Sequence, residues 1–517
     1  MSAFAEHLVI APIALPLAAG ALMLLFAERR HTLKACISLS AAVLLFAASL
    51  ALLERADAAV SHVYRLGNWP APFGIVLVAD RVSALMVLLA SALALAALAF
   101  SLARWHRAGP NFHALAQFLL AGLNGAFLTG DLFNLFVFFE LLLAASYGLA
   151  LHGSGTPRVR ASLHYIVVNL VASLLFLIGV SLMYGVTGTL NMADLAVRIA
   201  SVPDADRVLV EVGAVALGIA FLVKAGMWPL CFWLPATYGA ASAPAAAVFS
   251  ILTKVGVYAV LRLWLLLFGG AGAELLVYGG MATVAFGLVG LLASQELARM
   301  AGFSLLVSSG TLIAAIGLGG AAVTAAALYY LVVSTLGIGA FFLLIELVER
   351  ARAPGADVLA VTAEAFGLTA EEPEPEEEVG VVIPATMALL GLAFACSALL
   401  IAGLPPLPGF VAKFALLAAL LDADPVPGAS WAMLALLLLS GLAAIIALGR
   451  AGVRIFWASE EHSVPRVRVI EMLPVAALLA LCIALTVVAG PALRYMEGAA
   501  QALHAPGAYI EEVLSRP

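Results

Sequence analysis

Charged side chains are scarce in this chain. Asp, Glu, Lys and Arg make up only 11% of the 517 residues, whereas apolar residues make up 64%. No soluble core needs so apolar a composition, which excludes an ordinary soluble globular protein. The basic residues form no patch, so we expect no nucleic-acid partner. The composition predicts an all-α polytopic protein surrounded by the lipid bilayer.

Cofactor motifs are missing as well. Cys36, Cys231, Cys396 and Cys482 are far apart and belong to no CxxC or Cys/His cluster, so we expect neither a metal nor an iron–sulfur site. We find no nucleotide, haem or flavin motif and expect no cofactor. Residues 1–7 lack a positive region, so the apolar run that follows indicates a retained first span rather than a signal peptide.

Apolar runs predict about fourteen transmembrane helices, two of them broken. Pro229 interrupts the seventh, and Pro405, Pro406 and Pro408 interrupt the twelfth, because prolines cannot sit inside a continuous helix. The predicted spans are residues 8–27, 35–54, 82–103, 114–129, 132–152, 162–185, 208–235, 243–268, 274–293, 302–318, 321–347, 381–421, 431–449 and 470–490.

The two broken spans lie five apart, a pattern typical of inverted repeats around an ion path. We expect helices 1–3 in residues 1–110 and a first repeat, helices 4–8, in residues 111–270. A second repeat, helices 9–13, would occupy residues 271–455 and include an acidic loop at 349–380. Helix 14 and the C-terminal tail would follow in residues 456–517.

Basic residues predict the orientation. With the N-terminus outside, fourteen of the 25 lysines and arginines fall in inside loops, seven in outside segments and four within spans. This bias predicts both termini on the external side. Three of the four within spans are lysines. The fourth, Arg262, lies toward the end of its span, where it could snorkel to the interface.

Lys224 is the first of these lysines and lies five residues before Pro229. A charge at mid-bilayer costs roughly 2.5–3.5 kcal/mol on insertion scales, and a charge beside a broken helix is typical of ion pathways. The alternative is a lysine that snorkels beside a structural kink. We disfavour it because Lys224 lies about 18–24 Å along its helix from the expected start.

Glu140 lies nine residues beyond Asp131. That is about 13.5 Å of helix, close to the middle of a bilayer core of about 30 Å. An isolated carboxylate there takes up a proton, and an isolated lysine loses one, whereas the two together hold each other charged. Glu140 and Lys224 could therefore form a proton switch, in which separation releases the proton. A fixed structural ion pair is the alternative.

Other polar residues extend this candidate path. Lys254 fits a relay position beyond Lys224, and Lys413 fits an exit group in the second half. His164 could feed protons, although an interfacial anchor is the favoured interpretation. Four hydroxyl side chains on one later span could order water, but bonds to their own helix are favoured; they are Ser304, Ser308, Ser309 and Thr311.

Several segments together carry a family resemblance, namely Leu128–Glu140, Ala145–Leu149, Gly185–Asp194, Lys224–Pro235, Ser242–Lys254 and Gly403–Lys413. They resemble the proton-conducting membrane subunits shared by respiratory complex I and Mrp-type antiporters, and within these the D subunit of multisubunit Na⁺(K⁺)/H⁺ antiporters. The resemblance covers roughly residues 75–460. It implies a bacterial inner-membrane location and a central hydrated axis, along which Glu140, Lys224, Lys254 and Lys413 carry protons.

The chain also departs from the family pattern. Cys231 stands where many relatives have a histidine, and Ala236 where an acid often follows. The stretch Tyr329–Gly339 has no histidine or lysine, where relatives often have one. This departure puts a titratable link between Lys254 and Lys413 in doubt. Either water or the serines bridge the gap, or the second half is less conductive.

The leading hypothesis is a proton-translocating subunit of a multisubunit Na⁺ or K⁺/H⁺ antiporter. It would be a secondary transporter subunit, not an enzyme, in complex with other membrane subunits. The alternative is a proton-pumping, non-catalytic membrane subunit of a redox-driven complex, such as a complex I relative or a membrane-bound hydrogenase. A third hypothesis is an assembly scaffold without a working channel. The sequence leaves open whether the cation is Na⁺ or K⁺.

Overall fold

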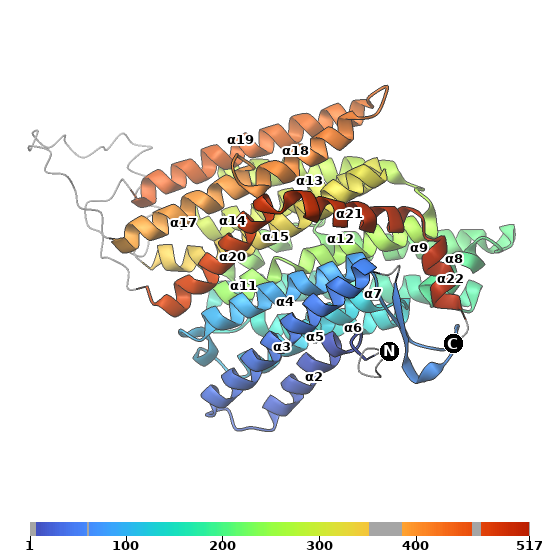
Figure 1. Ribbon diagram of the computed structural model, residues 1–517, viewed down its shortest axis with the longest axis horizontal. Helices are drawn as coiled ribbons and strands as arrows, with labels where there is room; N and C mark the ends of the chain where they lie inside the picture. Colours follow the sequence, from blue (N-terminus) through green and yellow to red (C-terminus); the bar gives the residue numbers. More distant parts are fainter. Residues whose placement is uncertain (1–6, 59–60, 351–384, 457–466, 516–517) are drawn as a thin grey trace, which may run out of the picture.

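Long helices that lie side by side form the whole body of the protein (Figure 1). The computed structural model describes residues 7–58, 61–350, 385–456 and 467–515. The acidic loop predicted at 349–380 therefore lies almost entirely outside the described residues. The helices are α2 (Ala11–Leu24), α3 (His31–Ala58), α4 (Arg81–Ser101), α5 (Phe112–Leu128), α6 (Leu132–Ala150), α7 (Thr156–Thr187), α8 (Met192–Ile199), α9 (Asp204–Ala225), α10 (Trp233–Ala240), α11 (Ala243–Phe249), α12 (Leu252–Leu263), α13 (Ala273–Ala293), α14 (Leu297–Leu318), α15 (Ala321–Glu349), α17 (Ala385–Ala402), α18 (Pro408–Leu421), α19 (Gly428–Phe456), α20 (Val469–Val487), α21 (Ala489–His504) and α22 (Gly507–Leu514).

The predicted all-α polytopic architecture is confirmed. Within the described ranges, 12 helical segments are long and apolar enough to cross a membrane, and α2, α5 and α18 are shorter apolar helices. Adding α2 and α5, and taking α17 with α18 as one broken span, gives the fourteen expected. An even number of spans places both ends of the chain on one side, as Figure 1 shows. The inverted-repeat relationship stays a prediction.

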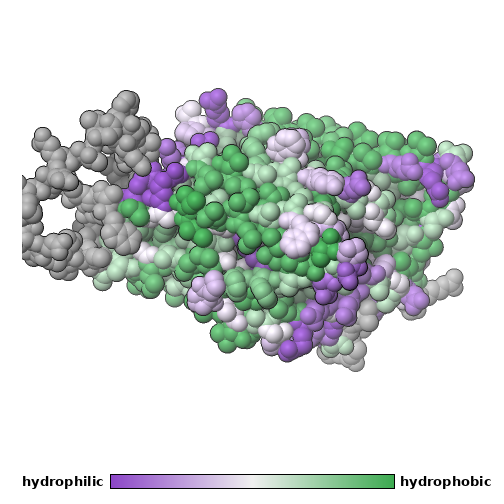
Figure 2. All heavy atoms as spheres, turned by 90° about the horizontal axis from the view of Figure 1, so that it is seen from above, coloured by the Kyte–Doolittle hydropathy of each residue, from purple (hydrophilic) through white to green (hydrophobic). Residues whose placement is uncertain are grey.

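The surface has the polarity that a bilayer requires. Apolar residues cover most of the face seen in Figure 2, and hydrophilic residues gather toward the two ends of the helices and along one edge. Inside the bundle, α15 is the most enclosed helix, since 94% of its most apolar stretch is buried. The helices that contact α15 include α14, α17, α18, α20 and α21, so this helix forms the centre of the second half.

Both predicted helix breaks are present. α9 ends at Ala225, where Gly226 adopts a φ of 76° that glycine tolerates, and Pro229 lies in the turn before α10. α17 ends at Ala402, where Gly403 has a φ of 79°, and α18 begins at Pro408. Each break leaves backbone carbonyls that the helix itself no longer satisfies. The second break uses one of them to hold a lysine, as described below.

Two small features were not predicted from the sequence. A hairpin of β1 (His62–Arg65) and β2 (Val76–Ala79) covers one end of the bundle, and the tail after the last span forms α21 and α22. Arg65 joins them, because its Nη2 donates to the backbone oxygens of Glu512 (3.1 Å), Val513 (3.2 Å) and Ser515 (2.7 Å). The hairpin and the last helix therefore close the same end of the molecule.

Candidate functional site

The break in α9 sets the position of Lys224. Lys224 lies in the last turn of α9 and is only 5% exposed. Its Nζ donates to Ser173 Oγ of α7 at 3.4 Å and lies 4.9 Å from the centroid of the Phe139 ring of α6. A cation above an aromatic face gains electrostatic stabilisation, especially where water is excluded. Lys224 is thus held by a hydroxyl and a ring, which are weak partners for a buried charge.

Glu140 is the neighbour of Phe139 on α6 and forms no ion pair with Lys224. No carboxylate oxygen within the described parts of the chain lies within 4.0 Å of Lys224. Glu140 is half-buried, and its Oε1 has no hydrogen-bond partner there. The structure therefore brings Glu140 and Lys224 onto adjacent elements, with Phe139 next to both, but leaves them unpaired.

Lys254 lies deeper than any other lysine of the path. It is 0% exposed, in the first turn of α12, and its Nζ donates to Ser308 Oγ at 2.9 Å and Ser309 Oγ at 3.2 Å, both on α14. Ser308 Oγ in turn lies 2.8 Å from Ser334 Oγ on α15. Three helices thus contribute one continuous chain of polar groups.

The interpretation that the hydroxyls of α14 bond to their own helix is half right. Ser304 donates to the Met300 carbonyl at 2.9 Å, and Thr311 donates to the Val307 carbonyl at 2.8 Å. For Ser308 and Ser309 the interpretation is wrong, because Lys254 donates to both. Ser308 and Ser309 follow one another, and only the placement of α12 against α14 decides which hydroxyls meet a lysine.

A close helix contact holds the two lysines of the first half in place. A side chain at Gly256 would lie 2.5 Å from Ala225 N and 2.8 Å from Phe221 O, so only glycine allows α12 to approach α9 here. Gly256 is two residues from Lys254, and Ala225 directly follows Lys224. The contact therefore fixes the end of α9, with its lysine, against the start of α12.

Lys413 occupies the second helix break. It lies in the first half of α18, is 9% exposed, and its Nζ donates to the Ala402 carbonyl at 2.8 Å, one of the carbonyls released where α17 ends. A side chain at Gly403 would come within 2.6 Å of Lys413 Cδ, so this glycine leaves room for the lysine. The Lys413 ammonium thus supplies the hydrogen bond that the Ala402 carbonyl would have received from a backbone N–H if the helix had continued.

A small cavity lies between the partners of Lys254 and the second break. Its volume is about 30 Å³, enough for one or two water molecules. Ser308 and Ser334 line one part of it, and Gly409 of α18 and Ser440 of α19 line another. This space, lined by serines among apolar side chains, lies where the sequence offered no histidine or lysine. Ser334 and Ser440 escaped the sequence analysis because isolated serines in apolar helices carry no signal of their own.

His164 does not join this cluster. Its side chain is exposed on α7, and its Nδ1 lies 3.2 Å from the Arg160 carbonyl of its own helix. The structure therefore places His164 on the exposed surface of α7 rather than beside the buried lysines.

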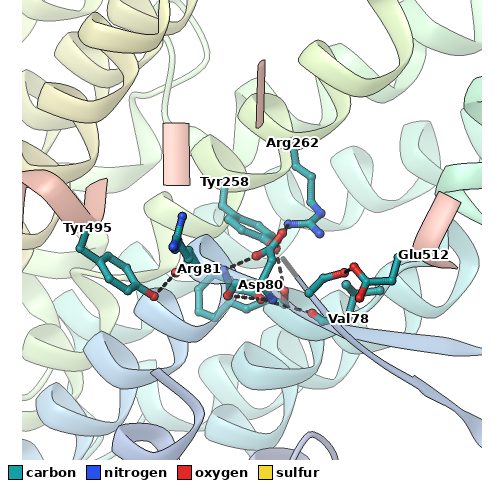
Figure 3. A network of polar contacts seen from close by, with 10 residues as sticks. Val78, Asp80, Arg81, Tyr258, Arg262, Tyr495 and Glu512 are labelled. Carbon is teal, nitrogen blue, oxygen red and sulfur yellow. Dashed lines mark hydrogen bonds and ion pairs between the residues drawn. The ribbon is translucent and has the colours of Figure 1, made fainter. Parts of the chain in front are cut away.

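Arg262 lies on the same face of α12 as Lys254, two turns farther along, and the expectation that it snorkels is wrong. It is 5% exposed, and its Nη1 lies 2.7 Å from Asp80 Oδ2 (Figure 3). Tyr258, midway between the two basic residues, accepts from Arg262 at 3.1 Å and donates to the Phe127 carbonyl at 2.6 Å. The Tyr509 ring of α22 lies 4.9 Å from the guanidinium. A buried ion pair therefore terminates the polar face of α12.

A comparison with known protein families shows which family has this arrangement. Residues 129–442 match the model of the NADH:quinone oxidoreductase/Mrp antiporter transmembrane family. The chain belongs to this family. Glu140, Lys224, Lys254 and Lys413 all fall within the matched residues. The two helix breaks do as well.

Relatives of the same family match the chain over its whole length. The chain is 60% identical to the probable K⁺/H⁺ antiporter D subunit of Rhizobium meliloti, covering 100% of this chain and 99% of that protein. It is 36% identical to the Na⁺/H⁺ antiporter D subunit of Alkalihalophilus pseudofirmus, covering 98% and 99%. A component of the Mrp complex structure from Dietzia sp. superposes with a TM-score of 0.85 at 27% identity, covering 99% of this chain and 100% of that one.

Proposed function

We propose that this protein is the proton-translocating subunit of a multisubunit monovalent cation/proton antiporter. The observation that carries the proposal is the set of three buried lysines within the spans, Lys224, Lys254 and Lys413, none with a carboxylate within ion-pair distance inside the described ranges. Unpaired buried ammonium groups are costly, so their retention favours a role that uses their protons. The two antiporter relatives match the chain over its full length, which supports the same conclusion.

In the first half, Lys224 would be the moving group. In the arrangement seen here its ammonium faces Ser173 and Phe139 and is not paired with Glu140. Rotation toward Glu140 would form a charge pair that holds the proton, and return would release it toward Lys254. The Gly256 contact keeps the backbone of both lysines still, so only side chains need to move.

In the second half, hydroxyl groups and water would replace the titratable residue of relatives. A proton leaving Lys254 would pass along Ser308 and Ser334 and through the 30 Å³ cavity toward Lys413. Hydroxyls both donate and accept, so they can pass a proton on without holding a charge. This route connects the two helix breaks.

Glu140 also indicates a partner protein in the membrane. It lies on a face of α6 where Phe133 and Val137 are 49% and 45% exposed. Glu140 is partly exposed on this face, and a carboxylate at mid-bilayer is costly, so another membrane subunit would cover this face. The complex would lie in the bacterial inner membrane, with both termini external and the two five-helix repeats related by inversion, in accord with the bias of basic loops.

The exchanged cation would be K⁺, because the relative at 60% identity is named for K⁺ and the Na⁺-named relative is only 36% identical. Exchange measured in everted vesicles with K⁺ and with Na⁺ separately tests this choice. Equal exchange of both ions would contradict it.

The central test is antiport in everted vesicles whose complexes carry Glu140→Gln or Lys224→Ala. We expect both to lose exchange while the complex still assembles. Arg160→Gln serves as the control because it removes an exposed basic residue that lies outside the proposed path. Normal exchange in both Glu140→Gln and Lys224→Ala would overturn the proposed mechanism.

A second candidate function is a pump module of a redox-driven complex, because the matched family includes NADH:quinone oxidoreductases. Purification of the native complex distinguishes the two. Small membrane antiporter subunits as partners support the first function, and iron–sulfur proteins would support the second.

A further inference from the structure

A basic cavity lies at the opposite end of the bundle from the hairpin, where α3 and α5 meet the turns before them. Its volume is about 200 Å³. Arg29, His31, Lys34, Arg107 and His113 line it, together with a single acid, Glu28. None of these residues belongs to the proposed proton path. The lining therefore has an excess of positive charge that the proposed function does not use.

The deepest groups of this cavity lack adequate partners. Lys34 is 5% exposed, yet within the described residues its Nζ donates only to Asn111 Oδ1, at 3.2 Å. His113 is 4% exposed, and neither ring nitrogen has a hydrogen-bond partner there. A buried ammonium beside an unsatisfied imidazole is costly unless an anion completes the site. Both groups line the cavity, so an anion that enters it can reach them.

His106 serves to orient an arginine rather than to bind a ligand. Its Nδ1 donates to the Ser101 carbonyl at 3.1 Å, so its Nε2 is the acceptor of the Arg107 Nε–H at 3.2 Å. Burial lowers the pKa of His106, the Ser101 hydrogen bond opposes this, and the charge of Arg107 lowers the pKa further. A neutral His106 leaves the other nitrogens of Arg107 free to bind at the cavity mouth.

We propose that this cavity binds a phosphate group. Lysine, arginine and imidazole donors that converge on one space are the groups that bind phosphate oxygens. The cavity holds a phosphate with some water, but it is too small for a nucleotide. Two sources carry this group, namely the headgroup of an anionic phospholipid and free inorganic phosphate. Leu25 and Leu33, which flank the site and are 80% and 37% exposed, would accommodate acyl chains of the first.

The test uses the intact purified complex that contains this chain, after delipidation. One arm measures phosphatidylglycerol binding by native mass spectrometry, and the other measures ³²P-orthophosphate binding by equilibrium dialysis. Lys34→Gln removes the buried cation. Arg107→Gln removes an exposed one, so it keeps the test valid if the buried variant fails to fold. Arg160→Gln is the matched control, because Arg160 is an exposed arginine on α7 that does not line the cavity.

We expect each of Lys34→Gln and Arg107→Gln to weaken binding by roughly tenfold, since each removes charge-assisted hydrogen bonds to the phosphate. Arg160→Gln should bind as the wild type does. If the two cavity variants lose phosphatidylglycerol binding, the ligand is a lipid headgroup. If they lose orthophosphate binding, the ligand is free phosphate. The proposal is overturned if the wild type binds neither probe, or if Arg160→Gln weakens binding as much as the cavity variants. Cation exchange is not the readout, so failure here is distinct from failure of the proposed function.

Discussion

Lys254 Nζ lies 2.9 Å from Ser308 Oγ, and Ser308 Oγ lies 2.8 Å from Ser334 Oγ. A lysine at the start of one helix is thus linked through two neighbouring helices to a cavity of about 30 Å³ that borders the second helix break. Since the central helices α14 and α15 supply the hydroxyls, the link between the two halves is built into the core of the bundle. Its residues can be changed without removing any charge.

The double variant Ser308→Ala/Ser334→Ala tests this link. Removing both hydroxyls leaves Lys254 with one partner fewer and interrupts the chain to the cavity. We expect exchange to slow by about tenfold, the equivalent of about 1.4 kcal/mol. Exchange rates in everted vesicles give the measurement. Ser397→Ala is the control, because Ser397 is also buried but donates to the Ala393 carbonyl of its own helix. Equal rates in all three proteins would rule the link out.

The contact at Gly256 predicts the effect of a single methyl group. Gly256→Ala would place a carbon 2.5 Å from the Ala225 nitrogen, and the backbone beside Lys224 would have to shift. We expect a loss of about 1–3 kcal/mol in stability, with slower exchange in the protein that still assembles. Gly218→Ala on α9 is the control, since a Cβ there meets nothing within 4 Å. Thermal unfolding in detergent measures both, and an unaffected Gly256→Ala protein would show that the approach is looser than the structure indicates.

Because Asp80 and Arg262 form an ion pair, the effects of substituting them on stability should not add. Their side chains are 14% and 6% exposed, so removing one partner leaves the other charge buried. We expect Asp80→Asn or Arg262→Gln alone to cost about 3–5 kcal/mol. The double variant should recover part of this loss, because no charge remains without a partner. The free energies of unfolding of the three variants, each compared with the wild type, give the coupling energy between the two side chains. Strict additivity would mean that the two groups do not act as a pair.

Asp131 predicts a dependence of stability on pH. It lies before α6, outside the spans, and burial raises its pKa to about 6, although hydrogen bonds from the backbone of Asn134 and Phe133 oppose this. The folded protein therefore holds this proton more tightly than the unfolded chain, whose pKa is near 3.8. Asp131 then makes its full contribution to stability below pH 4, and this contribution is lost as the pH rises from about 4 to about 6.

Asp131→Asn removes this titration but keeps an oxygen that can accept from the Asn134 backbone, as Asp131 does at 2.8 Å. We expect the apparent melting temperature of the variant to fall less than that of the wild type between pH 4 and pH 6.5. Asp204→Asn is the control, because the Asp204 side chain is 96% exposed. If Asp131→Asn and the wild type gave parallel pH profiles, the assignment to Asp131 would be wrong.

The sequence predicts the helices well because a bilayer demands long apolar runs. It also predicts both breaks, since prolines such as Pro229 and Pro406 cannot continue a helix. The hairpin at residues 62–79 and the helices α21 and α22 escaped prediction. The strands and α22 are short and are stabilised by contacts between segments far apart in the chain, and α21 packs against α15 and α4.

For the site, the sequence predicts which charges are buried but not what they face. Lys224 and Lys254 are evident because lysine is expensive in lipid. Ser173, the partner of Lys224, and Ser334, the partner of Ser308, are ordinary serines in apolar helices, and Asp80 lies in a loop 182 residues before Arg262. Such pairings depend on how helices pack, which a single sequence does not specify.

The contacts of Arg65 with α22 have a consequence for biosynthesis. Arg65 donates to the carbonyls of Glu512, Val513 and Ser515, which lie 447, 448 and 450 positions later in the chain. During translation this side of the nascent chain stays open until the ribosome has delivered α22, which follows the fourteen predicted spans. A premature stop just after α20 would leave all the predicted membrane helices present, but the end of the bundle that carries the hairpin would lack α21 and α22.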